Sequence, residues 1–129
     1  MKPPVRNLVV GLSLALVFLA GVAVGENQYG TPKSVIHLVA IKWKVEATEA
    51  DKERALQGVQ EMAASIPGIK NIWLKADRVQ PRDYHTAFAI EFESRAAADA
   101  YVDHPAHRAW ENIYLPIREQ SRSVQITNP

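Results

Sequence analysis

The sequence contains no cysteine in its 129 residues. Disulfide bonds, zinc sites built on thiolates and catalysis by a thiol are therefore excluded. An excess of charge of one sign is also missing, because 15 lysines and arginines stand against 14 aspartates and glutamates, a formal net charge of +1. A nearly neutral chain has no basic field with which to follow a phosphate backbone, so we expect no nucleic-acid partner.

Sequence fingerprints of cofactors are absent too. The chain has six glycines, and none of them belongs to a phosphate-binding loop or a dinucleotide fingerprint. The nearest approach to a metal motif is His104 and His107, but Pro105 between them keeps the two rings off a common helix face. Only His85 or Asp103 is available as a third ligand. We therefore expect no cofactor and no metal.

Hydrophobic residues are concentrated near the N-terminus. Residues 8–25 hold fourteen apolar side chains among eighteen and no charge, and Lys2 and Arg6 precede them. A basic stretch before an apolar run is typical of a secretory signal, and Ala23 and Gly25 supply the small residues of a cleavage site. The run also approaches the roughly 17 residues that cross a bilayer as a helix.

Residues 1–25 are therefore predicted to be either a cleaved signal peptide or an N-terminal membrane anchor. In both cases the basic flank keeps the N-terminus in the cytoplasm, and the remaining chain is exported to the periplasm or the extracellular space. Contact with a membrane is expected only through residues 8–25. Without Lys2 and Arg6 the exported part has a net charge of −1.

The exported part begins with a short linker over residues 26–34, and a folded domain is expected over residues 35–127. Strands are predicted where β-branched and aromatic residues gather, over residues 35–45, 69–78, 84–93 and 123–127. Helices are predicted over residues 48–65, with a buried stripe of Leu56, Val59, Ala63 and Ile66, and over residues 94–116 with a break at Pro105. The order βαββαβ is that of the ferredoxin-like α+β fold.

The first predicted strand, residues 35–45, is mainly apolar on both faces. In a ferredoxin-like subunit the helices cover only one face of the sheet, so the second apolar face needs another partner. A second copy of the same sheet is the simplest partner. The pattern therefore predicts a homodimer with two sheets face to face, a dimeric α/β barrel.

Three polar aromatic residues are the candidates for chemistry. His37 lies in the middle of an apolar strand face, and Tyr101 and His107 lie on either side of the Pro105 break, which can direct both toward one pocket. A neutral imidazole accepts a proton near neutral pH, and a phenol donates a hydrogen bond to an oxyanion. Together they can support enolisation of a carbonyl compound. Alternatively, His37 is a hydrogen-bonded core residue, and the histidines of the corner bond to backbone groups.

Several short motifs in this order resemble the stress-responsive dimeric α/β-barrel family, often called Dabb. They are Ile36-His37-Leu38-Val39, Lys42-Trp43-Lys44, Ile66-Pro67-Gly68-Ile69, Phe92-Glu93-Ser94 and the segment from Tyr101 to His107, YVDHPAH. The resemblance spans roughly residues 34–127 and implies a ferredoxin-like subunit in a homodimer.

The resemblance also implies roles for particular residues. A plant polyketide cyclase of the family uses a histidine on the first strand, with a tyrosine and a histidine around the HPxH corner, to promote an aldol-type ring closure. Those positions correspond to His37, Tyr101 and His107. The position of a further tyrosine of that cyclase corresponds to Val59 in this sequence, and the loop around Gln80 is shorter here. Both differences argue against a substrate shared with that cyclase.

The sequence leaves three functions open, and it favours the first, a stress-response protein of unassigned biochemical activity, over the second, an enzyme. The first is an exported homodimer that binds a small apolar or carbonyl-containing ligand between sheet and helices, in a pocket lined by Trp43, Phe88, His104 and Trp110. The second is a cyclase, isomerase or lyase with His107 as base, Tyr101 orienting it or donating to the oxyanion, and His37 as a further donor. The third is a structural or assembly protein in which bulky side chains fill the pocket.

Overall fold

The computed structural model describes residues 5, 9–10, 13 and 29–129. Apart from four positions, the export segment predicted over residues 1–25 lies outside the described residues. In the described part of the chain, no helix is long and apolar enough to cross a membrane. Residues 32–129 form a compact unit of their own.

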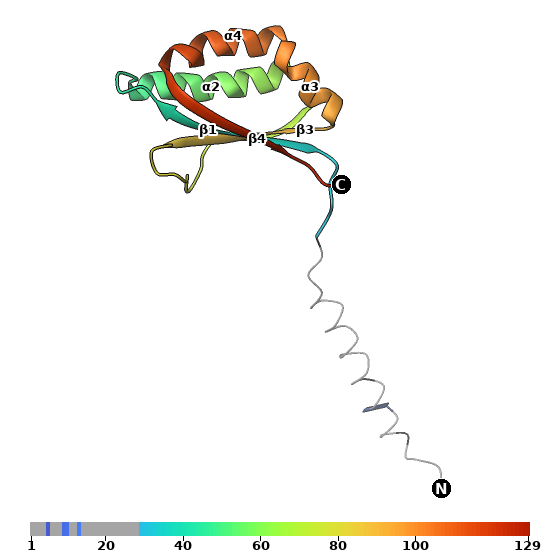
Figure 1. Cartoon of the computed structure of the whole chain (residues 1–129). Coiled ribbons are helices and arrows are strands. Elements are labelled where there is room, and N and C mark those ends of the chain that lie inside the picture. Colours follow the sequence, from blue (N-terminus) through green and yellow to red (C-terminus); the bar gives the residue numbers. More distant parts are fainter. Residues whose placement is uncertain (1–4, 6–8, 11–12, 14–28) are drawn as a thin grey trace. The chain divides into compact units, whose positions relative to one another are not determined.

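This unit is a four-stranded antiparallel sheet with its helices on one face (Figure 1). The elements in chain order are β1 (Val35–Trp43), α2 (Glu49–Ser65), β2 (Ile69–Trp73), β3 (Thr86–Phe92), α3 (Arg95–Asp103), α4 (Pro105–Tyr114), a short 3₁₀ turn η1 (Leu115–Ile117) and β4 (Arg118–Ile126). The strand order in the sheet is β2-β3-β1-β4. The ferredoxin-like βαββαβ subunit predicted from the sequence is confirmed.

Two strands differ in length from the prediction. β2 ends at Trp73 instead of residue 78, and β4 begins at Arg118 instead of residue 123. β4 is an edge strand that pairs with β1 from Ile36↔Ile126 to Trp43↔Arg118. Its first half is polar and largely exposed, as is common for edge strands, so the apolar pattern marks only its last residues.

The hydrophobic core lies between the sheet and the helices. β3 alternates as predicted, and the helix-facing side chains of β1 and β3 are buried, among them Val39, Ile41, Phe88, Ile90 and Phe92. The stripe that α2 buries is shifted from the prediction, because Leu56 and Ala63 are only half-buried. The buried residues of α2 are Ala55, Gly58, Val59 and Met62.

The opposite face of the sheet carries no helix (Figure 1). Large apolar side chains on this open face are exposed, with exposed fractions of 39% for Leu38, 49% for Trp73 and Val124, and 55% for Ile126. Leu38 pairs directly with Val124 across β1 and β4, so their side chains lie side by side. Apolar side chains therefore gather on the face of the sheet that no helix covers.

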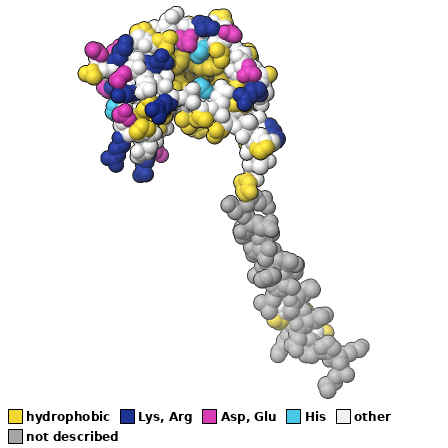
Figure 2. Space-filling view, in the orientation of Figure 1, with side chains coloured by type: hydrophobic (Ala, Val, Ile, Leu, Met, Phe, Trp, Pro, Cys, Tyr) yellow, Lys and Arg dark blue, Asp and Glu magenta, His cyan; other side chains and the backbone are white. Residues whose placement is uncertain are grey.

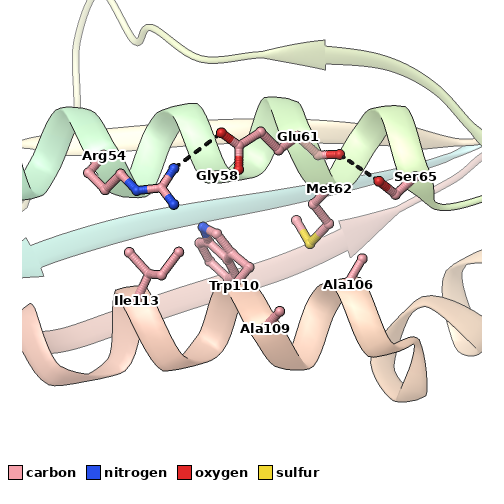
Figure 3. Close-up of a pocket in the computed structure, with 9 residues that line it drawn as sticks. All are labelled: Arg54, Gly58, Glu61, Met62, Ser65, Ala106, Ala109, Trp110 and Ile113. Carbon is pink, nitrogen blue, oxygen red and sulfur yellow. Dashed lines mark hydrogen bonds and ion pairs between the residues drawn. The ribbon is translucent and has the colours of Figure 1, made fainter.

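Gly58 allows α2 and α4 to pack closely. A Cβ atom at this position would lie 2.7 Å from Cδ1 of Trp110. The indole of Trp110 points from α4 toward α2 (Figure 3), and its Nε1 donates a hydrogen bond to the Ala55 carbonyl at 2.8 Å. Position 58 therefore requires glycine because the indole of Trp110 leaves no room for a Cβ atom, and not because of its backbone conformation.

Gly58→Ala is expected to lower the free energy of unfolding by about 1–3 kcal/mol, although alanine favours a helix more than glycine does. The added methyl displaces the indole and strains its hydrogen bond to Ala55. Urea unfolding of the variant and of wild type measures the effect, with Gln60→Ala on the exposed side of the same helix as control. A Gly58→Ala protein as stable as wild type would show that the contact tolerates a side chain.

Candidate functional site

A cavity of about 130 Å³ lies between α4, β1 and β4. Its lining includes His37, Tyr101 and His107, the three residues predicted to carry chemistry. Glu111 from α4 and Arg118 from β4 also line it. On this side of the molecule, Figure 2 shows histidine side chains next to hydrophobic ones. The structure thus brings together residues from four elements, β1, α3, α4 and β4.

The Pro105 break is what directs His107 into this cavity. α3 ends at Asp103, and His104 caps α4 by accepting a hydrogen bond from the backbone N–H of Ala106 at its Nδ1, 3.1 Å away. The corner turns His107 back against α3, where its Nδ1 lies 3.0 Å from the Val102 carbonyl oxygen. The local sequence therefore fixes the orientation of the imidazole.

The tautomer of His107 follows from this contact. A carbonyl oxygen only accepts hydrogen bonds, so the Nδ1 of the neutral ring carries the proton and donates it to Val102. Nε2 then holds the lone pair. The carboxylate of Glu111 lies 4.0 Å from Nε2, and it attracts the positive charge that forms when this nitrogen takes a proton.

Tyr101 lies between the two histidines. Its ring centroid is 4.3 Å from that of His107 and 6.0 Å from that of His37. Burial, followed by the negative charge of Glu111, raises the pKa of Tyr101 well above its usual range. The Tyr101 side chain is therefore a neutral phenol at physiological pH, a hydrogen-bond donor and not a base.

His37 is held in its neutral form. Burial, with a smaller contribution from the charge of His107, lowers the pKa of His37 from its ordinary value of 6.5. Among the described residues, its buried Nδ1 has no hydrogen-bond partner. His37 is thus a neutral imidazole in the wall of the cavity, with one buried ring nitrogen left unsatisfied.

The lowered pKa of His37 predicts how stability depends on pH. In the unfolded chain, His37 binds a proton as the pH falls below about 6.5, whereas in the folded protein it binds the proton only at a lower pH. The stabilisation is therefore complete above that pH and is lost as the pH falls toward the lower pKa of the folded state. His37→Gln is expected to lose less stability between about pH 7 and about pH 5 than wild type does, as measured by urea unfolding. Equal losses in wild type, His37→Gln and the exposed control His85→Gln would contradict this account.

The residues expected to line a ligand pocket are divided between the cavity and the core. Trp110 lines the cavity. Trp43 and Phe88 do not line the cavity. Trp43 is buried, and its Nε1 donates a hydrogen bond to Thr86 Oγ1 at 2.7 Å. Phe88 is buried as well and packs edge-on against Trp110. His104 serves as the cap of α4 and does not line the cavity.

Several polar residues of the cavity were missed by the sequence reasoning. Glu111 carried a signal, because it lies four residues after His107 on one helix and therefore on the same face. Arg118 and Ser121 carried none, because the first half of β4 was not predicted as a strand, whereas Ser123 began the strand predicted over residues 123–127. Ser121 and Ser123 lie opposite Ile41 and Val39 of β1 and so share the helix-covered side of the sheet.

A larger cavity of about 270 Å³ lies between α2 and α4 (Figure 3). Its charged residues Arg54 and Glu61 pair with each other at 3.1 Å, and none of the predicted catalytic residues lines it. No group of three or more histidine, aspartate or glutamate side chains placed to hold a metal ion occurs among the described residues. The smaller cavity is therefore the candidate site.

Comparison with known proteins places the chain in a family. Residues 35–128 match the family described as Stress responsive A/B Barrel Domain, Dabb. The chain belongs to this family. It is also similar to olivetolic acid cyclase from Cannabis sativa, with 31% identity over 90 residues, which cover 67% of this chain and 89% of the cyclase. The Dabb resemblance inferred from the motifs is thus confirmed.

Solved structures of similar fold come from several sources. A dimeric ferredoxin-like protein of unknown function from Thermobifida fusca superposes with a TM-score of 0.65 at 27% identity, covering 79% of this chain and 97% of that protein. A hydroxynitrile lyase from Passiflora edulis gives the same TM-score at 17% identity, covering 74% of this chain and 93% of the lyase. The latter likeness is one of fold alone.

Proposed function

We propose that this Dabb protein is an enzyme that moves a proton at a carbon next to a carbonyl group, as cyclases, isomerases and lyases do. The observation that carries the proposal is the arrangement of His107. Its Nδ1 is engaged by the Val102 carbonyl, its Nε2 is left with the lone pair, and the phenol of Tyr101 lies beside it in one cavity. A base and an oxyanion donor at one site are what enolisation requires.

His107, Tyr101 and Glu111 each have a separate role in the proposed reaction. Nε2 of His107 takes the proton from the carbon, the C–H electron pair forms a carbon–carbon double bond, and the carbonyl electron pair moves onto oxygen. The neutral phenol of Tyr101 donates a hydrogen bond to that oxyanion, and Glu111 stabilises the imidazolium. Return of the proton regenerates the ketone, whereas attack of the enolate on a second carbonyl forms a carbon–carbon bond.

Incorporation of solvent deuterium tests this function without knowledge of the natural substrate. The full-length protein is incubated in heavy water with a panel of small ketones and oxo acids, and loss of the proton signal next to the carbonyl is followed by NMR. Exchange faster than in protein-free buffer is expected for at least one compound. Binding of these compounds without faster exchange would favour a ligand-binding protein over an enzyme.

We further propose that the protein acts as a homodimer joined through the open face of the sheet, with Leu38, Trp73, Val124 and Ile126 in the interface. The apolar exposure of this face supports the proposal, as does the dimeric state of the similar protein from Thermobifida fusca. Two sheets packed in this way make the dimeric barrel predicted from strand 35–45.

Export through residues 1–25 is also proposed, on the basis of the basic flank and the uncharged apolar run over residues 8–25. A reporter that is active only outside the cytoplasm, fused after residue 129, is expected to give a signal. The mass of the mature protein distinguishes a cleaved signal from a retained anchor. A reporter active only in the cytoplasm would contradict export.

A further inference from the structure

One end of the candidate cavity is cationic. The guanidinium of Arg118 lies over the ring of Tyr114, 5.4 Å from its centroid, and donates a hydrogen bond to Ser121 Oγ at 3.0 Å. Within the described part of the chain, no carboxylate lies within 4.0 Å of this guanidinium. Arg108 differs, because it pairs with both Asp103 and Glu111. Arg118 is thus a cavity cation without an anionic partner among those residues.

Two residues that line the same cavity carry buried polar atoms without a hydrogen-bond partner. The hydroxyl of Tyr114 is buried without a hydrogen-bond partner among the described residues, and the residue is only 4% exposed. Nδ1 of His37 is in the same condition. Buried polar atoms in native proteins almost always have partners, so these two atoms indicate that a polar ligand belongs in the cavity.

The polar lining continues along β4. Ser121 and Ser123 both line the cavity, and alternate residues on one strand face lie about 6–7 Å apart. Hydroxyl groups therefore extend from the guanidinium of Arg118 toward the level of His37. A long aliphatic chain has no apolar wall on this side, whereas a short oxygen-rich molecule finds hydrogen-bond donors along its length.

We infer that the cavity takes a small carboxylate that also carries a carbonyl group, with the carboxylate held by Arg118 and the Tyr114 hydroxyl. The position of the carbonyl, between Tyr101 and His107, rests on the proposed function. The direction follows from charge, because Arg118 has no anionic partner among the described residues, whereas the His107 end of the cavity carries the carboxylate of Glu111, which pairs with Arg108. The size follows from the volume, since about 130 Å³ is well below the roughly 300 Å³ at which drug-sized pockets begin.

Levulinate and its methyl ester test the inference, because they share a ketone and differ in the negative charge. Calorimetric titration of the full-length protein is expected to show tighter binding of levulinate than of the ester. Arg118→Gln should weaken levulinate binding by roughly tenfold to a hundredfold and leave ester binding unchanged. Arg54→Gln, in the cavity between α2 and α4 where Arg54 already pairs with Glu61, is the matched control and should bind levulinate as wild type does.

Tyr114→Phe gives a second readout that does not depend on the charge of Arg118. Removal of an unpartnered buried hydroxyl is expected to leave the melting temperature of the ligand-free protein unchanged or higher. The same change should weaken levulinate binding several-fold, because the ligand loses a donor. A purely structural role for Tyr114 would instead lower the melting temperature and leave affinity unchanged, which would contradict the inference.

The outcomes separate this inference from the proposed function. Equal affinity for levulinate and its ester, or levulinate binding that survives Arg118→Gln, overturns the carboxylate site. Specific levulinate binding without proton exchange supports the carboxylate site and contradicts the enzyme. Exchange on both compounds together with equal affinity for both supports the enzyme and overturns the carboxylate site.

Discussion

His107→Gln is expected to slow protein-catalysed proton exchange by at least about a hundredfold, the usual contribution of a general base. Glutamine is a polar side chain of similar length, so it fills the space of the imidazole at the corner between α3 and α4. What the variant loses is a nitrogen lone pair that can take a proton. The effect should therefore fall on the exchange rate and leave substrate affinity nearly unchanged.

The matched control for this variant is His85→Gln. His85 precedes β3, is exposed and does not line the cavity. Exchange by His85→Gln should equal that of wild type, and both variants should unfold at nearly the wild-type denaturant concentration above about pH 7. If His107→Gln exchanges as fast as His85→Gln, another group is the base and the assignment of His107 is wrong.

The double variant Leu38→Lys with Val124→Lys is expected to convert the proposed homodimer to a monomer. The two side chains are directly paired on the open face, so the change places four like charges in the interface of two subunits. Each apolar side chain of this size contributes about 1.5–3 kcal/mol when fully buried, and an unpaired buried charge costs several kcal/mol more. Light scattering should therefore report twice the subunit mass for wild type and the single mass for the variant.

Val45→Lys is the control for this second prediction. Val45 follows β1, is 96% exposed and lies outside the sheet, so its replacement should leave the dimer intact. A monomeric wild-type protein at micromolar concentration would contradict the proposed interface. A double variant that keeps the dimer mass would place the contact elsewhere on the surface.

The sequence predicted the architecture because the apolar pattern and the structural period agree over most of the domain. β1 and β3 alternate, Thr48 caps α2 with Asp51 in the capping box, and Pro105 divides the last helical region in two. The prediction failed for the segment whose side chains face solvent, because packing in the core does not determine its sequence pattern. The first half of β4 is an edge strand of polar residues, and backbone pairing with β1 extends it without any apolar signal.

The candidate site was predictable in part for the same reason. His37, Tyr101 and His107 stand on elements whose positions follow from the βαββαβ order and from the proline corner, so their meeting in one cavity is a consequence of topology. Arg118 and Ser121 were not predictable, because they reach the cavity only through the pairing of β4 with β1 and the approach of Arg118 to Tyr114. Trp43 and Phe88 lie in the core and not in the cavity, because their large apolar surfaces are buried beneath α4.

Solvent-deuterium exchange into levulinate at a saturating concentration, followed by NMR on the full-length protein, tests the central claim most directly. One sample reports both binding, from line broadening, and chemistry, from loss of the proton signals beside the ketone. Exchange above the protein-free rate is expected with wild type, and near-background exchange with His107→Gln. Saturated binding to wild type with exchange no faster than in buffer would contradict it.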